Sequence, residues 1–467
     1  MKAGIPLKTL SRIGYTTDVS RSLAINIIAR HCKHHSREQL LQTLQQVQED
    51  PAAWKDHAAW APLAAHFLPD ADEQAFTEYD LRATAVACKT YGGKQIDSNA
   101  KQQMQLALQL PIALQGALMP DAHGGYGLPI GGVLATDNAV IPYAVGVDIG
   151  CRMALTIFGE NDKYLVRYAH RLKEALGEHT HFGMEGSLAQ RQEHAVMDDP
   201  LFNSSALVKS LQGKAYRQLG TSGGGNHFVE FGSIELYEGN SLSLPAGQYT
   251  ALLSHSGSRG LGAAIAMHYS QLAQQVCKLP REAQNLAWLD MQSEEGQAYW
   301  AAMTLAGNYA KACHDRIHAN LARALGLQAL VTVENHHNFA WKETLANGQE
   351  AIVHRKGATP AHAGQMGFIP GSMVDPGYLV RGKGVAQALQ SASHGAGRTL
   401  SRKRAKESIT VSSLKKLLAQ YQVTLIGGST EEAPAAYKDI ETVMELQADL
   451  VAVEGRFLPR MVRMNKE

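Results

Sequence analysis

The first ninety or so residues have the apolar spacing of helices. Residues 36–39 (Ser-Arg-Glu-Gln) match a helix-capping box, in which a serine and a glutamine side chain satisfy free backbone amides. The apolar residues that then fall on one helical face are Leu40, Leu41, Leu44 and Val47. This part of the chain is rich in Ala, Leu, Gln and His and poor in Gly. We therefore predict that residues 1–90 form a helical N-terminal extension.

From about residue 91 onward, short apolar runs alternate with glycine clusters and longer helical stretches. The runs that suit buried strands are 144–149, 249–253 and 330–333. The clearest helical stretches are 261–277, 297–325 and, closing the chain, 440–450. Neither a fixed-period repeat nor a linker interrupts this part. We predict an α+β fold for residues 91–467, one large layered domain with a mixed sheet flanked by helices.

Composition adds two facts to this pattern. Of the 467 residues, 45% are hydrophobic and 19% are charged, which is enough apolar material for a large core. The formal net charge is only +1, so any contact with nucleic acid must come from a local patch. The densest basic cluster is Arg398, Arg402, Lys403, Arg404 and Lys406.

The cysteines and the apolar segments indicate in which cellular compartment the protein resides. The chain has five cysteines and no C-x-x-C pair, which disfavours a disulfide framework and a zinc ribbon. Its first residues lack the apolar core of a signal peptide. The most apolar stretch, 128–150, carries Asp137 and Asp148, which a membrane span of about 20 residues would not tolerate. We expect a cytoplasmic protein that does not bind membranes.

Histidines stand beside glycine clusters at the ends of apolar runs. The histidine-containing segments are 223–227, 254–259, 335–338 and 393–398, and a fifth segment of this kind, 146–151, carries Asp148 and Cys151 instead. Imidazole, carboxylate and thiolate are all metal ligands, and Asp148 and Cys151 are three residues apart, so one turn can aim both at one ion. A thiolate can also bridge two ions. Taken alone, a histidine in such a segment is more often structural, and a lone Asp-x-x-Cys is usually accidental. The occurrence of five such segments in one glycine-rich domain favours a metal site.

Two glycine segments, 223–226 and 395–398, can turn backbone amides toward a phosphate. Tight turns are the commoner use of such glycines. The sequence contains neither a G-x-x-x-x-G-K-[ST] loop nor a G-x-G-x-x-G fingerprint in a βαβ context. These absences disfavour an ordinary P-loop NTPase and a dinucleotide-binding fold.

Several motifs together resemble the RtcB-type RNA-splicing ligases, in that family's order. They are residues 119–123, 146–151, 223–230, 255–260, 337–338, 354–358, 370–373, 393–398 and 437–440. The resemblance runs from about Tyr91 to the C-terminus and implies an RtcB-like fold. The extension falls outside it.

The resemblance implies a site with two Mn²⁺ ions bridged by Cys151. Asp148 and His227 would complete the coordination of one ion, and His255 and His337 that of the other. Because thiolates favour softer ions than manganese, zinc is a competing occupant of such a site.

The resemblance also implies that His394 attacks the α-phosphorus of GTP and forms a covalent histidine–GMP intermediate. The GMP would pass to an RNA 3′-phosphate, and a 5′-hydroxyl would then close the phosphodiester bond. A 2′,3′-cyclic phosphate would first be opened at the metal site. The implied biological setting is tRNA splicing or RNA repair, and some members of the family use an archease-type activator.

Further positions match the family around the nucleotide and the RNA. The implied nucleotide-binding residues are Asn226, Glu230, Ser372, Gly395, Ala396, Gly397 and Arg398. The expected contacts to RNA or phosphate are Arg259, Arg402, Lys403 and Arg404.

The chain departs from the family at two positions near the expected base. Met464 aligns with a C-terminal lysine that contacts guanine, and only a two-residue shift recruits Lys466 instead. Gly377 stands where the family often has serine. Guanine selectivity is therefore open.

Two other functions compete with the ligase. One is a two-metal phosphoesterase or nuclease acting on RNA ends, which would have no use for His394 as a nucleophile. The other is a silent RNA-binding protein, which would have no use for an intact set of metal ligands. We favour the ligase.

Overall fold

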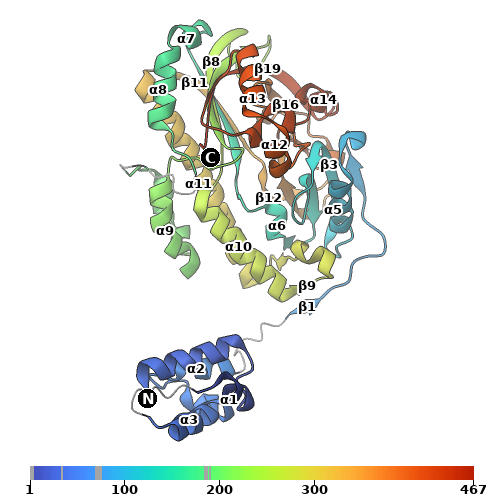
Figure 1. The fold of residues 1–467 in the computed structure, drawn as a ribbon. Coiled ribbons are helices and arrows are strands. Elements are labelled where there is room, and N and C mark those ends of the chain that lie inside the picture. The colour runs from blue at the N-terminus through green and yellow to red at the C-terminus, as the bar shows by residue number, and fades with distance from the viewer. Residues whose placement is uncertain (1–4, 33–34, 69–75, 184–187, 189–190, 467) are drawn as a thin grey trace. The chain divides into compact units, whose positions relative to one another are not determined.

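The computed structural model describes residues 5–32, 35–68, 76–183, 188 and 191–466, and it contains two compact units, Met1–Phe76 and Thr77–Glu467 (Figure 1). None of the helices among the described residues is long and apolar enough to span a membrane.

The N-terminal unit is a small helical domain with its own core. Its helices are α1 (Leu7–Arg12), α2 (Asp18–His31), α3 (Arg37–Glu49), η1 (Pro51–Trp54) and α4 (Ala61–Phe67). The predicted capping box is present at Ser36 and Gln39. Leu40, Leu44 and Val47 are buried against the other helices, which confirms the predicted apolar face.

The compact units divide earlier than the change in sequence texture at residue 90. The short strand β1 (Thr77–Glu78) pairs with β9 (Cys277–Lys278). Strand β2 (Cys88–Thr90) pairs with β3 (Ala113–His123). Residues 77–90 therefore belong to the second unit through backbone pairing with distant segments, which local apolar spacing does not reveal.

The centre of the second unit is an eight-stranded mixed sheet. Its order is β11 (Ala329–His336), β6 (Arg152–Phe158), β8 (Gly247–Ser256), β7 (Phe228–Leu236), β19 (Val451–Met464), β16 (Gly377–Gly382) and β15 (Met366–Ile369), with β18 (Thr424–Ile426) also paired to β19. All the pairs are antiparallel except β18–β19. This sheet supplies one wall of the site described below.

The described residues also form a second sheet and, besides β1–β9, two short strand pairs. The five-stranded sheet has the order β12 (Asn338–Thr344), β13 (Glu350–Lys356), β4 (Ile130–Thr136), β3 and β2. The short pairs are β5 (Ala139–Val140) with β10 (Leu289–Asp290), and β14 (Ala358–Pro360) with β17 (Ser391–Ser393).

Helices flank the sheets, as the predicted α+β class requires. They are α5 (Ser98–Leu108), α6 (Pro142–Val145), α7 (Lys163–Arg167), α8 (Ala169–His179), α9 (Ala206–Gln218), α10 (Arg259–Val276), α11 (Glu294–Leu325), α12 (Arg402–Ser408), α13 (Val411–Gln420) and α14 (Ile440–Glu445). The 3-10 turns in the described part of this unit are η2 (Gly93–Gln95), η3 (Ala195–Asp198), η4 (Pro200–Asn203), η5 (Arg281–Leu286), η6 (Ala386–Ala388), η7 (Thr430–Glu432) and η8 (Pro434–Ala436). The long helices α10 and α11 run side by side (Figure 1).

Most of the predicted elements are confirmed, and two are wrong. The predicted strands 249–253 and 330–333 lie within β8 and β11, and the two long helices match α10 and α11. The run 144–149 is not a strand, because Pro142 starts the short helix α6 and Gly146, at φ +101°, ends it. The helix predicted for 440–450 stops at Glu445, and strand β19 closes the chain.

Candidate active site

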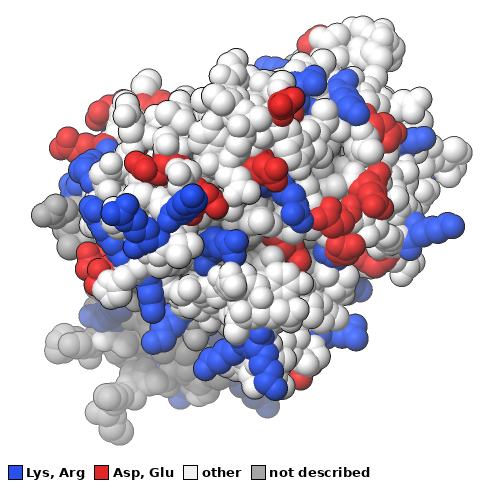
Figure 2. Space-filling view, turned by 90° about the horizontal axis from the view of Figure 1, so that it is seen from above, with Lys and Arg blue, Asp and Glu red and all other residues white. Residues whose placement is uncertain are grey.

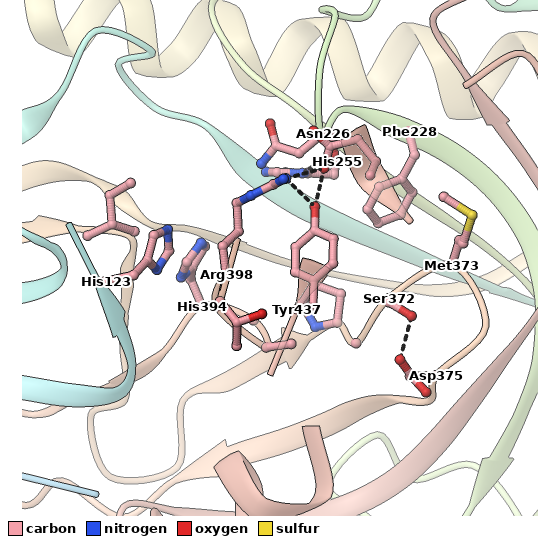
Figure 3. A pocket seen from close by; sticks show the side chains of 18 of the residues that line it. His123, Asn226, Phe228, His255, Ser372, Met373, Asp375, His394, Arg398 and Tyr437 are labelled. Carbon is pink, nitrogen blue, oxygen red and sulfur yellow. Dashed lines mark hydrogen bonds and ion pairs between the residues drawn. The ribbon is translucent and has the colours of Figure 1, made fainter. Parts of the chain in front are cut away.

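One face of the eight-stranded sheet lines a cavity of about 910 Å³ (Figure 3). Strand register explains which side chains share that face. Glu230 pairs with Leu253 on one side and Val462 on the other, and Phe228 pairs with His255 and Met464. Because direct cross-strand partners point the same way, these side chains form one continuous wall.

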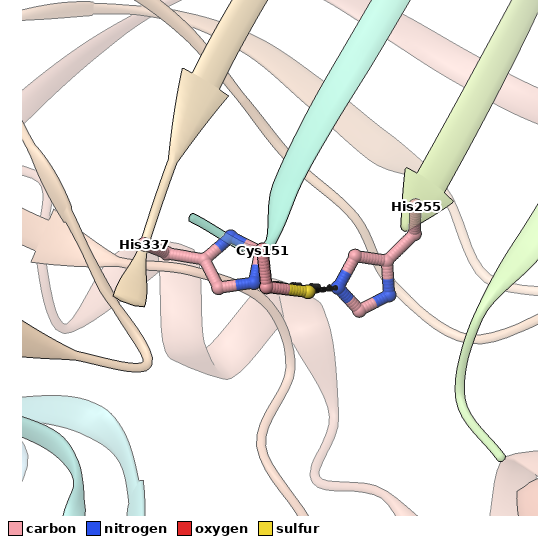
Figure 4. A group of neighbouring side chains, drawn as sticks. All are labelled: Cys151, His255 and His337. Carbon is pink, nitrogen blue, oxygen red and sulfur yellow. Dashed lines mark hydrogen bonds between the residues drawn. The ribbon is translucent and has the colours of Figure 1, made fainter. Parts of the chain in front are cut away.

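Two groups of ligand-type side chains meet at the end of this wall. In the first, Cys151 Sγ lies 3.2 Å from His255 Nε2, and His255 Nε2 lies 3.3 Å from His337 Nε2 (Figure 4). In the second, His227 Nε2 lies 3.0 Å from Asp148 Oδ2 and 3.4 Å from Cys151 Sγ. Cys151 belongs to both groups, so all five predicted metal ligands are brought together around one sulfur atom.

Glycines make the room that these ligands occupy. A Cβ atom on Gly257 would lie 2.0 Å from Asp148 Oδ1, and one on Gly223 would lie 1.9 Å from His227 Nδ1. Gly150 has φ +71°, and a Cβ there would approach Gly307 of α11 to 2.7 Å. These contacts leave no space for a larger residue.

The chemistry of the donor set fits metal ions. His255 Nδ1 lies 3.0 Å from the carbonyl of Asn226, so it donates its proton there and Nε2 offers a lone pair to the cluster. Burial lowers the pKa of His255 to about 3, and it also lowers the pKa of His337 far below its usual value. Both rings are therefore neutral near pH 7, as metal ligation requires.

The pKa values of the two acidic ligands, Cys151 and Asp148, are shifted in opposite directions. Burial, followed by the nearby Asp148 carboxylate, raises the pKa of the Cys151 thiol well above its usual value. Burial acts to raise the pKa of Asp148 as well, but hydrogen bonding and charge from His227 lower it overall. A bound cation would favour the thiolate form of Cys151. It would also offset the electrostatic repulsion between this thiolate and the Asp148 carboxylate.

The predicted nucleophile His394 is held by a buried carboxylate. Asp121 Oδ2 accepts hydrogen bonds from His394 Nδ1 at 2.7 Å and from the His394 backbone amide at 3.1 Å. Burial acts to raise the pKa of Asp121, but His394, His123 and Lys438 together lower it. The carboxylate therefore fixes the proton on Nδ1 and leaves Nε2 with a free lone pair. The rings of His394 and His337 have centroids 4.9 Å apart.

Asp121 was not identified as a site residue from the sequence. The signal was available, since residues 119–123 are among the motifs that resemble the family. A single aspartate at the end of an apolar strand gives no indication of its distant partner. Lys438 strengthens the same corner by donating to the carbonyls of Pro120 and Ala122.

All seven predicted nucleotide-binding residues line the cavity, namely Asn226, Glu230, Ser372, Gly395, Ala396, Gly397 and Arg398. Ser372 Oγ donates a hydrogen bond to Asp375, its neighbour in the loop between β15 and β16 (Figure 3). Glu230 is buried, and burial raises the pKa of its carboxyl group well above the usual value.

Arg398 is engaged mainly within the protein. Its guanidinium donates to Glu432 at 2.8 Å, to the carbonyl of Glu431 at 2.7 Å and to the carbonyl of Leu400 at 3.0 Å, and it lies over the Tyr437 ring. These contacts occupy much of its donor capacity, so the structure gives Arg398 a role in holding the loop after His394.

The other predicted cations divide into two sets. Arg402 and Arg404 of α12 line the cavity, and Arg402 is 54% exposed while lying 3.5 Å from Glu432. Lys403 is directed to solvent and pairs with Glu407, whereas Arg259 donates to Thr221 and to the carbonyl of Gly183. The structure does not bring Arg259 or Lys403 to the described cavity wall.

The face shown in Figure 2 carries interspersed acidic and basic side chains, with the basic ones in small groups. This distribution agrees with the net charge of +1.

The structure separates the two candidate residues at the C-terminus. Met464 is 4% exposed and lines the cavity, whereas Lys466 is exposed and is not among the lining residues. Gly377 also lines the cavity, and a Cβ atom there would approach the Phe368 ring to 2.4 Å. Packing of Phe368 thus explains why this chain has no serine at that position.

Comparisons with known proteins agree with this geometry. The family described as tRNA-splicing ligase RtcB matches residues 103–206 and 182–465, which leaves the N-terminal unit outside the match. The chain is 33% identical over 390 residues to the RNA-splicing ligase RtcB of Escherichia coli K12, covering 77% of this chain and 93% of that protein. It is 31% identical over 436 residues to the tRNA-splicing ligase RtcB of Nanoarchaeum equitans, covering 78% and 91%. The chain therefore belongs to the RtcB family.

Proposed function

We propose that this protein joins an RNA 3′-phosphate or 2′,3′-cyclic phosphate end to a 5′-hydroxyl end, using GTP, two Mn²⁺ ions and a covalent histidine–GMP intermediate. Its relatives are named RNA-splicing and tRNA-splicing ligases, and the chain is accordingly an RNA ligase. The observation that carries the finer proposal is the pairing of His394 with Asp121 beside a five-residue ligand cluster.

The Asp121–His394 pair supports a nucleophilic role for the imidazole. With the proton held on Nδ1, the Nε2 lone pair can attack the α-phosphorus of GTP, forming an N–P bond while the bond to pyrophosphate breaks. The ring gains positive charge as this bond forms. The Asp121 carboxylate, 2.7 Å away, stabilises that charge.

The ligand cluster supports binding of two metal ions. Asp148, Cys151 and His227 would hold one ion, and Cys151, His255 and His337 the other. When bound, such ions supply positive charge that neutralises phosphate oxygens and lowers the pKa of a nearby hydroxyl group. The second nitrogen of His255 is fixed by the Asn226 carbonyl, so that ligand needs little reorganisation.

The remaining lining residues support binding of phosphates and RNA. The backbone amides at Gly395, Ala396 and Gly397 follow directly on His394, where a triphosphate must lie for attack at its α-phosphorus. Arg402 and Arg404 extend the wall with positive charge toward solvent. An RNA backbone is the polyanion that such an edge would attract.

A joining assay tests the proposal against phosphoester hydrolysis. The protein would be incubated with Mn²⁺, GTP, an RNA carrying a labelled 3′-phosphate and an RNA with a 5′-hydroxyl end. We expect the label to move into a phosphatase-resistant junction in the longer product, and we expect His394→Ala to abolish joining. His170→Ala is the matched control, since that ring is 84% exposed on α8. Release of the label as inorganic phosphate, without joining, would instead establish a phosphoesterase.

A further inference from the structure

Glu230 is a buried carboxyl group without a partner among the described residues. It is 4% exposed, makes no hydrogen bond or ion pair to the described residues, and lines the cavity. Its cross-strand neighbours on both sides, Leu253 and Val462, are apolar. A buried carboxyl group among apolar neighbours is expected either to form hydrogen bonds with a bound ligand or to remain protonated.

The walls around Glu230 are apolar. Phe228, Met373, Val462 and Met464 line this end of the cavity, and Met373, Val462 and Met464 belong to one buried cluster. Figure 3 shows Phe228 and Met373 on the side of the cavity away from His123 and His394. A flat aromatic base suits such a slot, because it buries its faces against apolar side chains.

No cation of the described wall is placed to ionise Glu230. Burial alone accounts for its raised pKa, without an offset from any neighbouring positive charge. Arg398 and Arg402 lie beside Glu432, and Lys466 is exposed outside the cavity. Asp375 is the other acid at this end, and its carboxylate accepts the hydrogen bond from Ser372.

The protonation of one carboxyl group decides which purine edge it matches. A carboxylate accepts two hydrogen bonds, which suits the N1–H and N2 amino donors of guanine. A neutral carboxylic acid offers one donor and one acceptor, which suits N1 and the N6 amino group of adenine. It can also meet guanine at O6 and N1–H, but the guanine N2 amino group is then left to find a partner in an apolar pocket.

We propose that this end of the cavity binds a purine base through Glu230 and accepts adenine as well as guanine, so that ATP serves alongside GTP as the nucleotide. Met464 contributes to this breadth, because it lies two residues along β19 from Val462, the partner of Glu230, and its thioether brings no positive charge to the cavity wall. The inference rests on the proposed function, since it assigns the base to the nucleotide that would modify His394.

Competition binding tests the proposal without any chemical step. ATP and GTP, each with Mn²⁺, would displace a fluorescent GTP analogue from the full-length protein. We expect the two dissociation constants to agree within about tenfold. Discrimination of this size is typical of a pocket that has no dedicated hydrogen-bond partner for the groups in which the two bases differ. GTP binding more than tenfold tighter than ATP would overturn the inference, as would binding of neither nucleotide.

Two variants test what sets the nucleotide preference, and a third serves as a control. Met464→Lys should raise the preference for GTP over ATP at least about tenfold, since an ammonium group would ionise Glu230 and donate to guanine O6. Met464→Leu is the matched control and should leave the preference unchanged. Glu230→Gln retains one donor and one acceptor, so it should change the preference less than about threefold. A large loss of ATP binding in Glu230→Gln would refute the neutral carboxyl group, even if Met464→Lys did not fold.

Labelling separates this inference from the proposed function. Transfer of label from α-labelled nucleotide to wild-type protein, and not to His394→Ala, supports the nucleotidyl-histidine step. Suppose that GTP labels His394, but that ATP binds more than tenfold more weakly than GTP and labels the protein more than tenfold less. The proposed function then stands, and the inference about the base fails.

Discussion

Replacing Asp121 with asparagine isolates the contribution of charge to the nucleophile. The asparagine carbonyl can still accept from His394 Nδ1 and from its backbone amide, the two hydrogen bonds of 2.7 and 3.1 Å in the structure. A hydrogen bond to an ionised partner is worth about 1.5–3 kcal/mol, roughly twice a neutral one. Because asparagine keeps a neutral hydrogen bond, the loss as the ring gains positive charge is about half of that, about 0.75–1.5 kcal/mol, which corresponds to about a 4–13-fold slower nucleotidyl transfer.

Single-turnover labelling with α-labelled GTP measures this step directly. Asp121 Oδ1 is buried and unpartnered among the described residues, so the asparagine amide would also leave a buried donor there and lower the free energy of unfolding by about 1–3 kcal/mol. Circular dichroism must therefore show folded protein at the assay temperature. Asp137→Asn, at an exposed position, is the control for an amide substitution. A folded Asp121→Asn protein that labels at the wild-type rate would refute the assigned role.

Three further predictions concern metal binding and pH. Cys151→Ala should lose both manganese ions in metal analysis of the dialysed protein, because its sulfur is shared by both ligand groups; retention of two ions would disprove the bridge. Gly257→Ala should weaken manganese binding, since the new methyl group would overlap the Asp148 carboxylate, whereas Gly177→Ala on α8 meets nothing within 4 Å and should bind normally. Burial lowers the pKa of His354 from 6.5 to about 4. Its contribution to stability is therefore complete above pH 6.5 and declines as the pH falls toward 4, by about 2 kcal/mol between pH 7 and pH 5. Urea unfolding of His354→Gln should lack this part of the pH dependence, and an identical profile in both proteins would contradict it.

Local spacing predicted the elements whose neighbours are close in sequence. The helices α10 and α11 follow from apolar residues at helical intervals, and β8 follows from the short, mostly apolar run 249–253. The run 144–149 misled the same reasoning, because a short buried helix and a buried strand are equally apolar. Only the positive φ of Gly146 and the proline at position 142 distinguish the two, and their effect depends on packing against α10 and β13.

The sequence predicted some residues of the site and missed others. Asp148 and Cys151 attracted attention because they are three residues apart, and the histidines because they adjoin glycines. The glycines prove to have a packing purpose at Gly223 and Gly257, where any side chain would displace a ligand. The pairing of Asp121 with His394 joins residues 273 positions apart, which no local pattern reveals. The unpartnered state of Glu230 likewise depends on strand register, which places Leu253 and Val462 beside it.

Mapping the covalent adduct is the most direct measurement of the central claim. The protein would be incubated with Mn²⁺ and GTP and then digested under neutral or alkaline conditions, since a phosphoramidate is labile in acid, and the peptides would be sequenced by mass spectrometry. We predict GMP on His394 alone, present in wild-type protein and in the exposed control His170→Ala, and absent from His394→Ala. A GMP adduct on another residue, or efficient RNA joining by the His394→Ala protein, would contradict the account.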